Sequence, residues 1–138
     1  MIQIDSFNCE NQRFLVRVDF NVPMDSELNI TDDNRIRAAL LTINKIILLG
    51  GSVILMSHRG RPNGYSSDLS MRHLVKPLSN LLNLNVKFVD QCIGKNAVRI
   101  SKSLKSGEVL LLENLRFHDE EIAGNKHFAE ELSALGDI

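Results

Sequence analysis

Basic and amide side chains follow three apolar segments of this chain, at the points where those segments end. The string DFN lies at residues 19–21, HRGR at 58–61 and ENLR at 113–116. In an open parallel sheet the carboxyl ends of the strands share one edge, and ligands bind in the crevice outside that edge. The three strings are therefore expected to bring guanidinium and imidazole groups together. Fixed positive charge of this kind suits a small ligand with several negative charges.

A further arginine, Arg35, falls in the first turn of the first expected helix. The start of a helix is a favourable place for an anion, and a guanidinium beside it adds to the attraction. A cation there also opposes the positive end of the helix dipole. The alternative is therefore an arginine that turns back to Asp32 or Asp33, and position alone favours neither interpretation.

The carboxylate of Asp19 and the amide of Asn21 also have two interpretations. Asp19 and Asn21 could hydrogen-bond to the hydroxyls of a substrate, or they could hold the turn before Pro23. For either residue alone the turn is the better interpretation, because Asp and Asn side chains commonly bond to nearby backbone in turns.

The basic loop 58–62 could be a binding site or a solvated surface loop. Gly60 permits a tight backbone and Pro62 fixes the exit from the turn, and the position after a buried strand favours a site. Arg116 follows a buried strand in the same way, and Asn114 could brace its loop.

Strands and helices alternate along the chain. Apolar runs predict strands at about 14–19, 52–57, 86–89 and 108–112. Three- and four-residue spacing predicts four helices, with inward residues Ile36, Leu40, Ile43 and Ile47; Leu74, Leu78, Leu81 and Leu82; Val98 and Leu104; and Phe128, Leu132 and Leu135. The alternation predicts a three-layer α/β/α fold with an open, Rossmann-like parallel sheet of four strands.

The expected helix boundaries rest on a few residues. Asp32 and Asp33, with Thr31, are candidate caps for the first helix, Ser70 for the second and Asn125 for the last, which ends at Gly136. Pro77 should kink the second helix because it removes a hydrogen bond. The aromatic residues Phe14, Phe20 and Phe88 are expected in the core.

Composition narrows the possible functions. A net charge of −1 over 138 residues counts against a nucleic-acid binder, and no apolar run approaches the length of a membrane span. The sequence shows no signal peptide at residues 1–5, and its two cysteines have no metal-type spacing, so a cytoplasmic protein without a metal site is expected. No GxxxxGK[ST], GxGxxG or GxSxG string is present, so no nucleotide site is visible in the chain.

Four strings occur in an order and spacing that resemble one family. RVDFNVP at 17–23, RIRAA at 35–39, SHRGRP at 57–62 and ENLRF at 113–117 look like the N-terminal, substrate-binding domain of phosphoglycerate kinase. The resemblance covers nearly the whole chain. It implies a reversible transfer of a phosphoryl group between 1,3-bisphosphoglycerate and ADP, which gives 3-phosphoglycerate and ATP.

The resemblance also implies roles for individual residues. Asp19 and Asn21, with Phe20 between them, would contact the glycerate part of 3-phosphoglycerate. A basic patch formed by His58, Arg61 and Arg116 would hold the phosphate end, and Gly60 would also contact the substrate. Arg35 would lie beside the transferring phosphoryl group and be catalytic. Position 59 is commonly leucine in the family, so Arg59 is expected to contribute only a backbone contact.

The resemblance further implies that the chain is partial. The family domain has six parallel strands in the order 3-4-2-1-5-6, and a second domain binds Mg²⁺ with ATP or ADP. The chain would then be a partial N-terminal domain over residues 1–138, without kinase activity on its own. The full enzyme is expected to be a monomer, whereas the fragment could self-associate. The alternative is a stand-alone anion-binding or regulatory module with the same fold.

Overall fold

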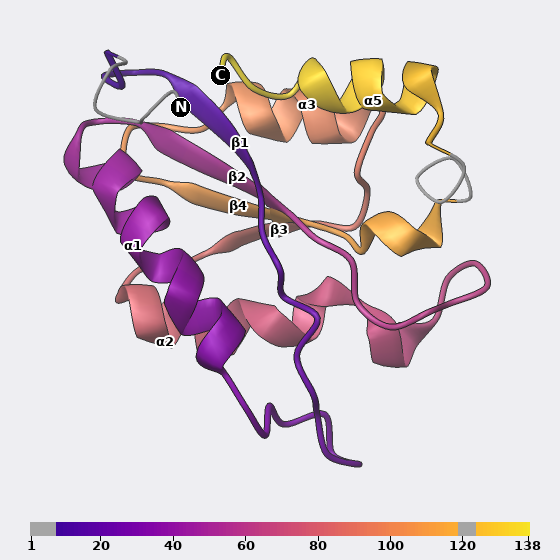
Figure 1. Ribbon diagram of the computed structural model, residues 1–138. Coiled ribbons are helices and arrows are strands. Elements are labelled where there is room, and N and C mark those ends of the chain that lie inside the picture. The colour runs from indigo at the N-terminus through magenta and orange to yellow at the C-terminus, as the bar shows by residue number, and fades with distance from the viewer. Residues whose placement is uncertain (1–7, 119–123) are drawn as a thin grey trace.

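The computed structural model describes residues 8–118 and 124–138. Its centre is a parallel sheet of β1 (Arg13–Arg17), β2 (Ser52–Met56), β4 (Val109–Leu112) and β3 (Lys87–Val89), in that order across the sheet (Figure 1). This order agrees with the expected order 3-4-2-1, and the four strands lie where the sequence predicts them. Residues 1–5, to which the signal-peptide prediction refers, lie outside the described residues.

Helices cover both faces of the sheet. Figure 1 shows α1 (Asn34–Leu48) and α2 (Val75–Leu82) on one face, with α3 (Lys95–Lys102) and α5 (Lys126–Ser133) on the other. Three short 3₁₀ turns complete the described elements: η2 (Ser67–Leu69), η3 (Met71–Leu74) and η4 (Leu115–Phe117). The predicted three-layer α/β/α architecture is confirmed. No helix among the described residues is long and apolar enough to cross a membrane.

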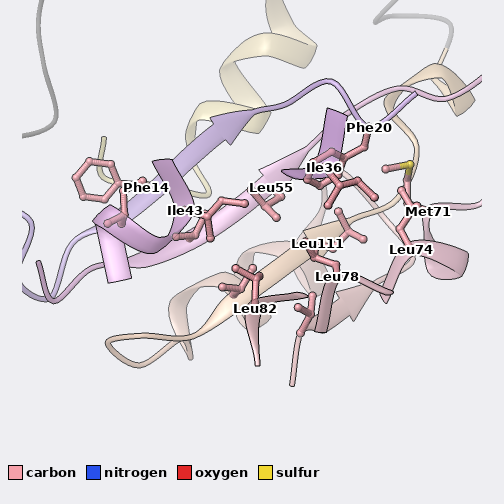
Figure 2. Close-up of a cluster of buried hydrophobic side chains, with 14 of the residues drawn as sticks. Phe14, Phe20, Ile36, Ile43, Leu55, Met71, Leu74, Leu78, Leu82 and Leu111 are labelled. Carbon is pink, nitrogen blue, oxygen red and sulfur yellow. The ribbon is translucent and has the colours of Figure 1, made fainter. Parts of the chain in front are cut away.

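The two central strands are apolar from Val53 to Met56 and from Val109 to Leu112 because they are buried on both sides. Successive side chains of a strand point to opposite faces. Leu55 and Leu111 therefore pack under α1 and α2, whereas Ile54 and Leu110 pack under α3 and α5. Figure 2 shows the cluster under α1 and α2, into which Phe14 and Phe20 also point. The structure thus confirms that these two phenylalanines belong to the core.

The helix boundaries follow from capping groups that the sequence displays. Asn125 caps α5 by accepting a hydrogen bond from Phe128 N at 2.9 Å, and Ser70 accepts one from Arg72 N at 3.2 Å. At α1 the capping residue is Asp33, but its side chain makes no capping bond. The carboxylate of Asp32 instead accepts from Asn34 N at 2.9 Å.

Two details of the helices differ from the prediction. The segment after Ser70 begins as the 3₁₀ turn η3, and α2 starts only at Val75. Pro77 therefore lies in the first turn of α2, where an N–H has no intrahelical partner, and the predicted kink is wrong. The expected inward residues Val98 and Leu104 do pack against the core but are only partly buried, and the fully buried positions of α3 are Ala97 and Ser101. Small residues at these positions let the helix approach the sheet closely.

Candidate functional site

Three loops meet at the carboxyl edge of the sheet: the β1 loop (18–23), the β2 loop (57–62) and the β4 loop (113–117). Ser57 joins all three, since its hydroxyl accepts from Phe20 N at 3.0 Å and its carbonyl accepts from Leu115 N at 3.0 Å. Asn21 Oδ1 adds a second link by accepting from Gly60 N at 2.9 Å. Segments distant in sequence are therefore fixed against each other before any ligand binds.

The buried side chain of Asn114 braces two of these loops. Its Oδ1 accepts from Arg59 N at 3.1 Å and from Arg116 N at 3.0 Å. Its Nδ2 donates to Arg59 O at 2.7 Å and to Leu69 O at 2.9 Å. One amide thus makes four hydrogen bonds, which is the full capacity of its two N–H donors and two lone pairs. The bracing role expected for Asn114 is confirmed.

The neighbouring carboxylate of Glu113 holds the segment that precedes α2. It is buried and accepts hydrogen bonds from Ser70 Oγ at 2.7 Å, Met71 N at 2.8 Å and Asn114 N at 2.9 Å. Three donors satisfy a charge that would otherwise be costly to bury. Sequence reasoning missed this role, although an acid directly after a fully apolar strand was a visible signal.

Gly60 is required by the shape of the β2 loop. Its φ of +66° lies in the left-handed region, and a Cβ at this position would come within 2.7 Å of Leu69 Cδ2. Only glycine combines this backbone angle with so close an approach. The β2 loop therefore packs directly on the η2 turn.

Arg35 turns toward the β1 loop. Its Nη1 donates to the carbonyl of Asn21 and lies 3.5 Å from Asp19 Oδ1. Of the two interpretations of Arg35, the return to Asp32 or Asp33 is therefore not the one observed. The side chain stays 52% exposed. It borders a hollow of about 390 Å³ together with Asn21, Pro23 and Asp32.

The β1 loop itself is partly self-supporting. Asp19 Oδ1 accepts from Asn21 N at 3.2 Å, which is the turn-holding role, while the Asp19 side chain is 63% exposed. Phe20 differs from the expectation that it contacts substrate. Its side chain is fully buried, its N–H donates to Ser57 and its carbonyl accepts from Val22 N at 2.8 Å. Phe20 therefore positions its neighbours from the core.

The three remaining cations lie at the same edge with different exposure. His58 and Arg116 are half-buried, and Arg61 is exposed. Within the described residues, Arg61 makes no hydrogen bond or ion pair. The buried Nε of Arg116 has no hydrogen-bond acceptor in that same part of the chain. A buried donor without an acceptor costs about 1–3 kcal/mol, which an oxygen of a bound anion would offset.

Arg59 departs from its expected role as a backbone contact. Both its N–H and its carbonyl bond to Asn114, and the residue is only 6% exposed. Nη1 donates to Asp68 O at 2.7 Å. Burial lowers the pKa of this guanidinium, and the charge of Asp68 partly opposes that effect. Arg59 therefore points into the protein, away from the exposed face of the loop.

Comparison with known proteins agrees with this arrangement. The family model for phosphoglycerate kinase matches residues 4–138. The chain belongs to the phosphoglycerate kinase family. It is 52% identical over 118 residues to phosphoglycerate kinase of Porphyromonas gingivalis, which covers 86% of this chain and 28% of that protein. It is 46% identical over 129 residues to the Aquifex aeolicus protein of the same name, covering 94% and 32%.

Solved phosphoglycerate kinase structures share the fold. The crystal structure from Pyrococcus horikoshii matches with a TM-score of 0.87 and 35% identity, covering 99% of this chain and 35% of that one. The structure from Coxiella burnetii matches with a TM-score of 0.83 and 32% identity, covering 97% and 33%. The chain therefore spans about a third of the length of the phosphoglycerate kinases that it matches.

Proposed function

We propose that this chain forms the acceptor-binding part of a phosphoglycerate kinase. The full protein would transfer a phosphoryl group reversibly between 1,3-bisphosphoglycerate and ADP, giving 3-phosphoglycerate and ATP. The observation that supports this most is the edge at which hydrogen-bonded loops gather His58, Arg61 and Arg116. Arg35 lies across the β1 loop from them, at the start of α1.

The chemistry of the acceptor fits a site of this kind. In the direction of ATP use the acceptor is a carboxylate, which is ionised at neutral pH because its pKa is near 4. No general base is needed to activate it. The difficulty is to bring an anionic nucleophile to an anionic phosphoryl donor, and fixed guanidinium groups reduce that repulsion.

Each residue then has a role that its geometry allows. Arg61 and Arg116, with His58, would hold the phosphate of 3-phosphoglycerate. Asp19 would accept a hydrogen bond from the glycerate hydroxyl. Asn21 Oδ1 already bonds to Gly60 N, so its amide nitrogen would be the group that reaches the substrate.

Arg35 would be the catalytic residue. A guanidinium has five N–H donors. Of the three nitrogens of the Arg35 guanidinium, only Nη1 has a partner among the described residues. Nε and Nη2 would therefore remain to stabilise charge on the transferring phosphoryl group.

Mg²⁺ with ATP or ADP would bind outside this chain. The described residues contain no group of three or more His, Cys, Asp or Glu side chains that could hold a metal ion, and the sequence lacks a phosphate-binding loop. We therefore assign residues 1–138 to a partial N-terminal domain and the nucleotide to a C-terminal domain of the full-length protein. The chain alone would lack kinase activity, because transfer needs both substrates held together away from water.

The full-length enzyme would work as a monomer in the cytoplasm. The two cysteines, Cys9 and Cys92, are buried and form no disulfide with each other, as expected for a reducing compartment.

Calorimetric titration of the chain with 3-phosphoglycerate tests this function. We expect saturable binding that weakens between low and high salt, because exposed charges are screened. Inorganic phosphate is the matched control ligand, since it lacks the glycerate part. Equal affinity for both ligands would favour the alternative of an anion-binding module. Turnover of Mg-ATP by the purified chain in a coupled assay would contradict the assignment of the nucleotide to another domain.

A further inference from the structure

The segment 60–66, which carries Arg61, is held to the rest of the molecule at its base and near its tip. We infer that Arg59, at the base, and the ring contact between Tyr65 and Phe117, at the tip, are positioning groups that hold Arg61 beside Arg116. The inference makes two claims. The structural half is that the two contacts hold the segment 60–66 in place, and it needs no ligand. The claim that they affect ligand binding rests on the proposed function.

At the base, three buried side chains hold four consecutive residues. Arg59 Nη1 donates to the carbonyl of Asp68, and Asn114 Nδ2 donates to that of Leu69. Glu113 accepts from Ser70 Oγ and Met71 N. The side chain of Arg59 closes the segment 60–66 on itself, because it joins the residue before Gly60 to the turn after Ser66. Asn114 closes the same base a second time, because its amide bonds to Arg59 O and to Leu69 O. Losing the Arg59 contact would therefore loosen the base of the segment.

At the tip, the ring of Tyr65 meets that of Phe117 edge to face, with centroids 5.2 Å apart and an interplanar angle of 62°. This geometry is favourable for aromatic pairs. Tyr65 stays 62% exposed, so the contact lies on the surface of the protein. Phe117 directly follows Arg116 in η4. The tip contact therefore ties the segment of Arg61 to the turn of Arg116.

The side-chain donor at position 59 strengthens the base. A leucine at this position could fill part of the same volume but could not donate to Asp68 O. The guanidinium supplies this donor even though its Nε is buried without a hydrogen-bond partner among the described residues. Arg61 has no anchor of its own there. Its position consequently depends on the contacts that hold its segment, to which the bond from Gly60 N to Asn21 Oδ1 also contributes.

Tyrosine fluorescence measures the segment directly, because Tyr65 is the single tyrosine and the chain has no tryptophan. Arg59→Met keeps a long buried side chain and removes the donors. We expect Arg59→Met to raise acrylamide quenching of Tyr65 and to lower its anisotropy, with Arg99→Met, in the exposed part of α3, as the control that changes neither. Unchanged quenching and anisotropy in Arg59→Met would overturn the inference. This readout needs no ligand, so it decides the structural half even if 3-phosphoglycerate does not bind.

A double-mutant cycle tests whether Arg59 acts through Arg61. We expect Arg59→Met to weaken 3-phosphoglycerate binding about tenfold in the unmodified chain, the effect of one charge-assisted hydrogen bond. In an Arg61→Ala background the same change should weaken binding less than about twofold, because the positioned group is gone. Arg59→Lys, which can still donate to Asp68 O, should restore part of the affinity. Equal losses in both backgrounds would overturn the inference.

Two further outcomes are also decisive. If the unmodified chain binds no 3-phosphoglycerate while the fluorescence effect is seen, the proposed function fails and the positioning of the segment stands. If Arg59→Met does not fold, Phe117→Leu removes only the tip contact and takes its place in both experiments. Tyr65 quenching that stays unchanged in Phe117→Leu would then overturn the inference.

Discussion

At the scale of single residues, the site depends on cations that differ in how much of their bonding capacity the protein uses. Asp68 takes one donor of Arg59, and Asn21 and Asp19 take one of Arg35. Arg61 has no such partner among the described residues, and one buried donor of Arg116 has none there either. We therefore expect Arg61 and Arg116 to bind the anion, and Arg35 to act in the phosphoryl-transfer step.

Arg61→Ala and Arg116→Ala should each weaken binding of 3-phosphoglycerate to the chain. A hydrogen bond to a charged group contributes about 1.5–3 kcal/mol, so the loss should be roughly tenfold or more for each variant. Titration calorimetry at low salt measures the effect. Arg99→Ala is the control, because Arg99 lies on α3 and bonds to Asn96. Undiminished binding by both site variants would show that the phosphate is held elsewhere.

Arg35→Ala should behave differently in a full-length enzyme with this N-terminal sequence. We expect kcat to fall by more than about tenfold while KM for 3-phosphoglycerate changes little, because an interaction made mainly in the transition state affects turnover. Steady-state kinetics with both substrates varied provides the measurement. A rise in KM at constant kcat would instead place Arg35 among the residues that anchor the ground state.

At the scale of elements, the loops matter through the side chains that join them. Asn114→Ala should lower the free energy of unfolding by about 3–5 kcal/mol, because it leaves four buried or partly buried backbone groups without their partner. Asn125→Ala, which removes the cap of α5, should cost only about 1 kcal/mol. Urea denaturation of both variants compares the two costs. Similar small losses would mean that water replaces the Asn114 amide without difficulty.

Local patterns were enough to predict the elements themselves. The strands at Val53 and Val109 show continuous apolar runs because both of their faces are buried. Ser70 and Asn125 were recognisable caps, since a capping bond spans only two or three residues. The kink at Pro77 failed as a prediction because the start of α2 depends on a preceding 3₁₀ turn, which apolar spacing does not reveal.

The candidate site was predictable as a location but not as a set of contacts. The topology of a parallel sheet places 19–21, 58–61 and 113–116 at one edge, and this followed from the order of elements. The burial of Arg59 and its bond to Asp68 could not be predicted, because a side chain's direction depends on packing between segments. The same limit applies to Glu113, two of whose three partners lie more than 40 residues away in the sequence.

At the scale of the whole molecule, a bidentate ion pair ties the last described residues to the edge strand. The Asp137 carboxylate accepts from Arg13 N at 2.9 Å and from the Arg13 guanidinium at 3.1 and 3.3 Å. These bonds hold the pKa of Asp137 below its usual value. The bonds from the Arg13 side chain have the larger effect, and the bond from its backbone has the next largest. The pair should therefore stabilise the folded chain only where Asp137 is ionised.

The sign of the pH dependence follows from the lowered pKa. The contribution of Asp137 is fully present above the unfolded pKa of about 3.9 and is lost as the pH falls through the lower folded value. Solvent screens this partly exposed pair, so the effect should be at most about 1 kcal/mol. Asp137→Asn should lower the melting temperature at pH 7 and have little effect at pH 2. A constant difference between variant and parent at all pH values would contradict this assignment.

The same edge strand carries the prediction for assembly of the chain. Among the described residues, β1 pairs with a strand, β2, on one side only. On its other side, Asp137 and Ile138 form hydrogen bonds with Arg13 and Leu15. Beside β1 lies a hollow of about 370 Å³, largely apolar, that Met56 and Phe128 help to line. An unpaired strand next to apolar surface tends to recruit another strand. We expect the isolated chain to associate with itself through β1, with an apparent mass that rises with concentration in sedimentation experiments.

Two variants test where such association occurs. By alternation along the strand, the N–H of Arg17 points to the same side as that of Leu15, away from β2. Arg17→Pro would hinder the pairing of a further strand along β1 without breaking a bond to β2, and should return the chain to monomers. Leu48→Glu changes the other candidate surface, the face of α1 on which Leu41 and Leu48 are 82% and 85% exposed, and should leave association intact. If Leu48→Glu alone gives monomers, or the parent chain stays monomeric at every concentration, association does not occur through the β1 edge.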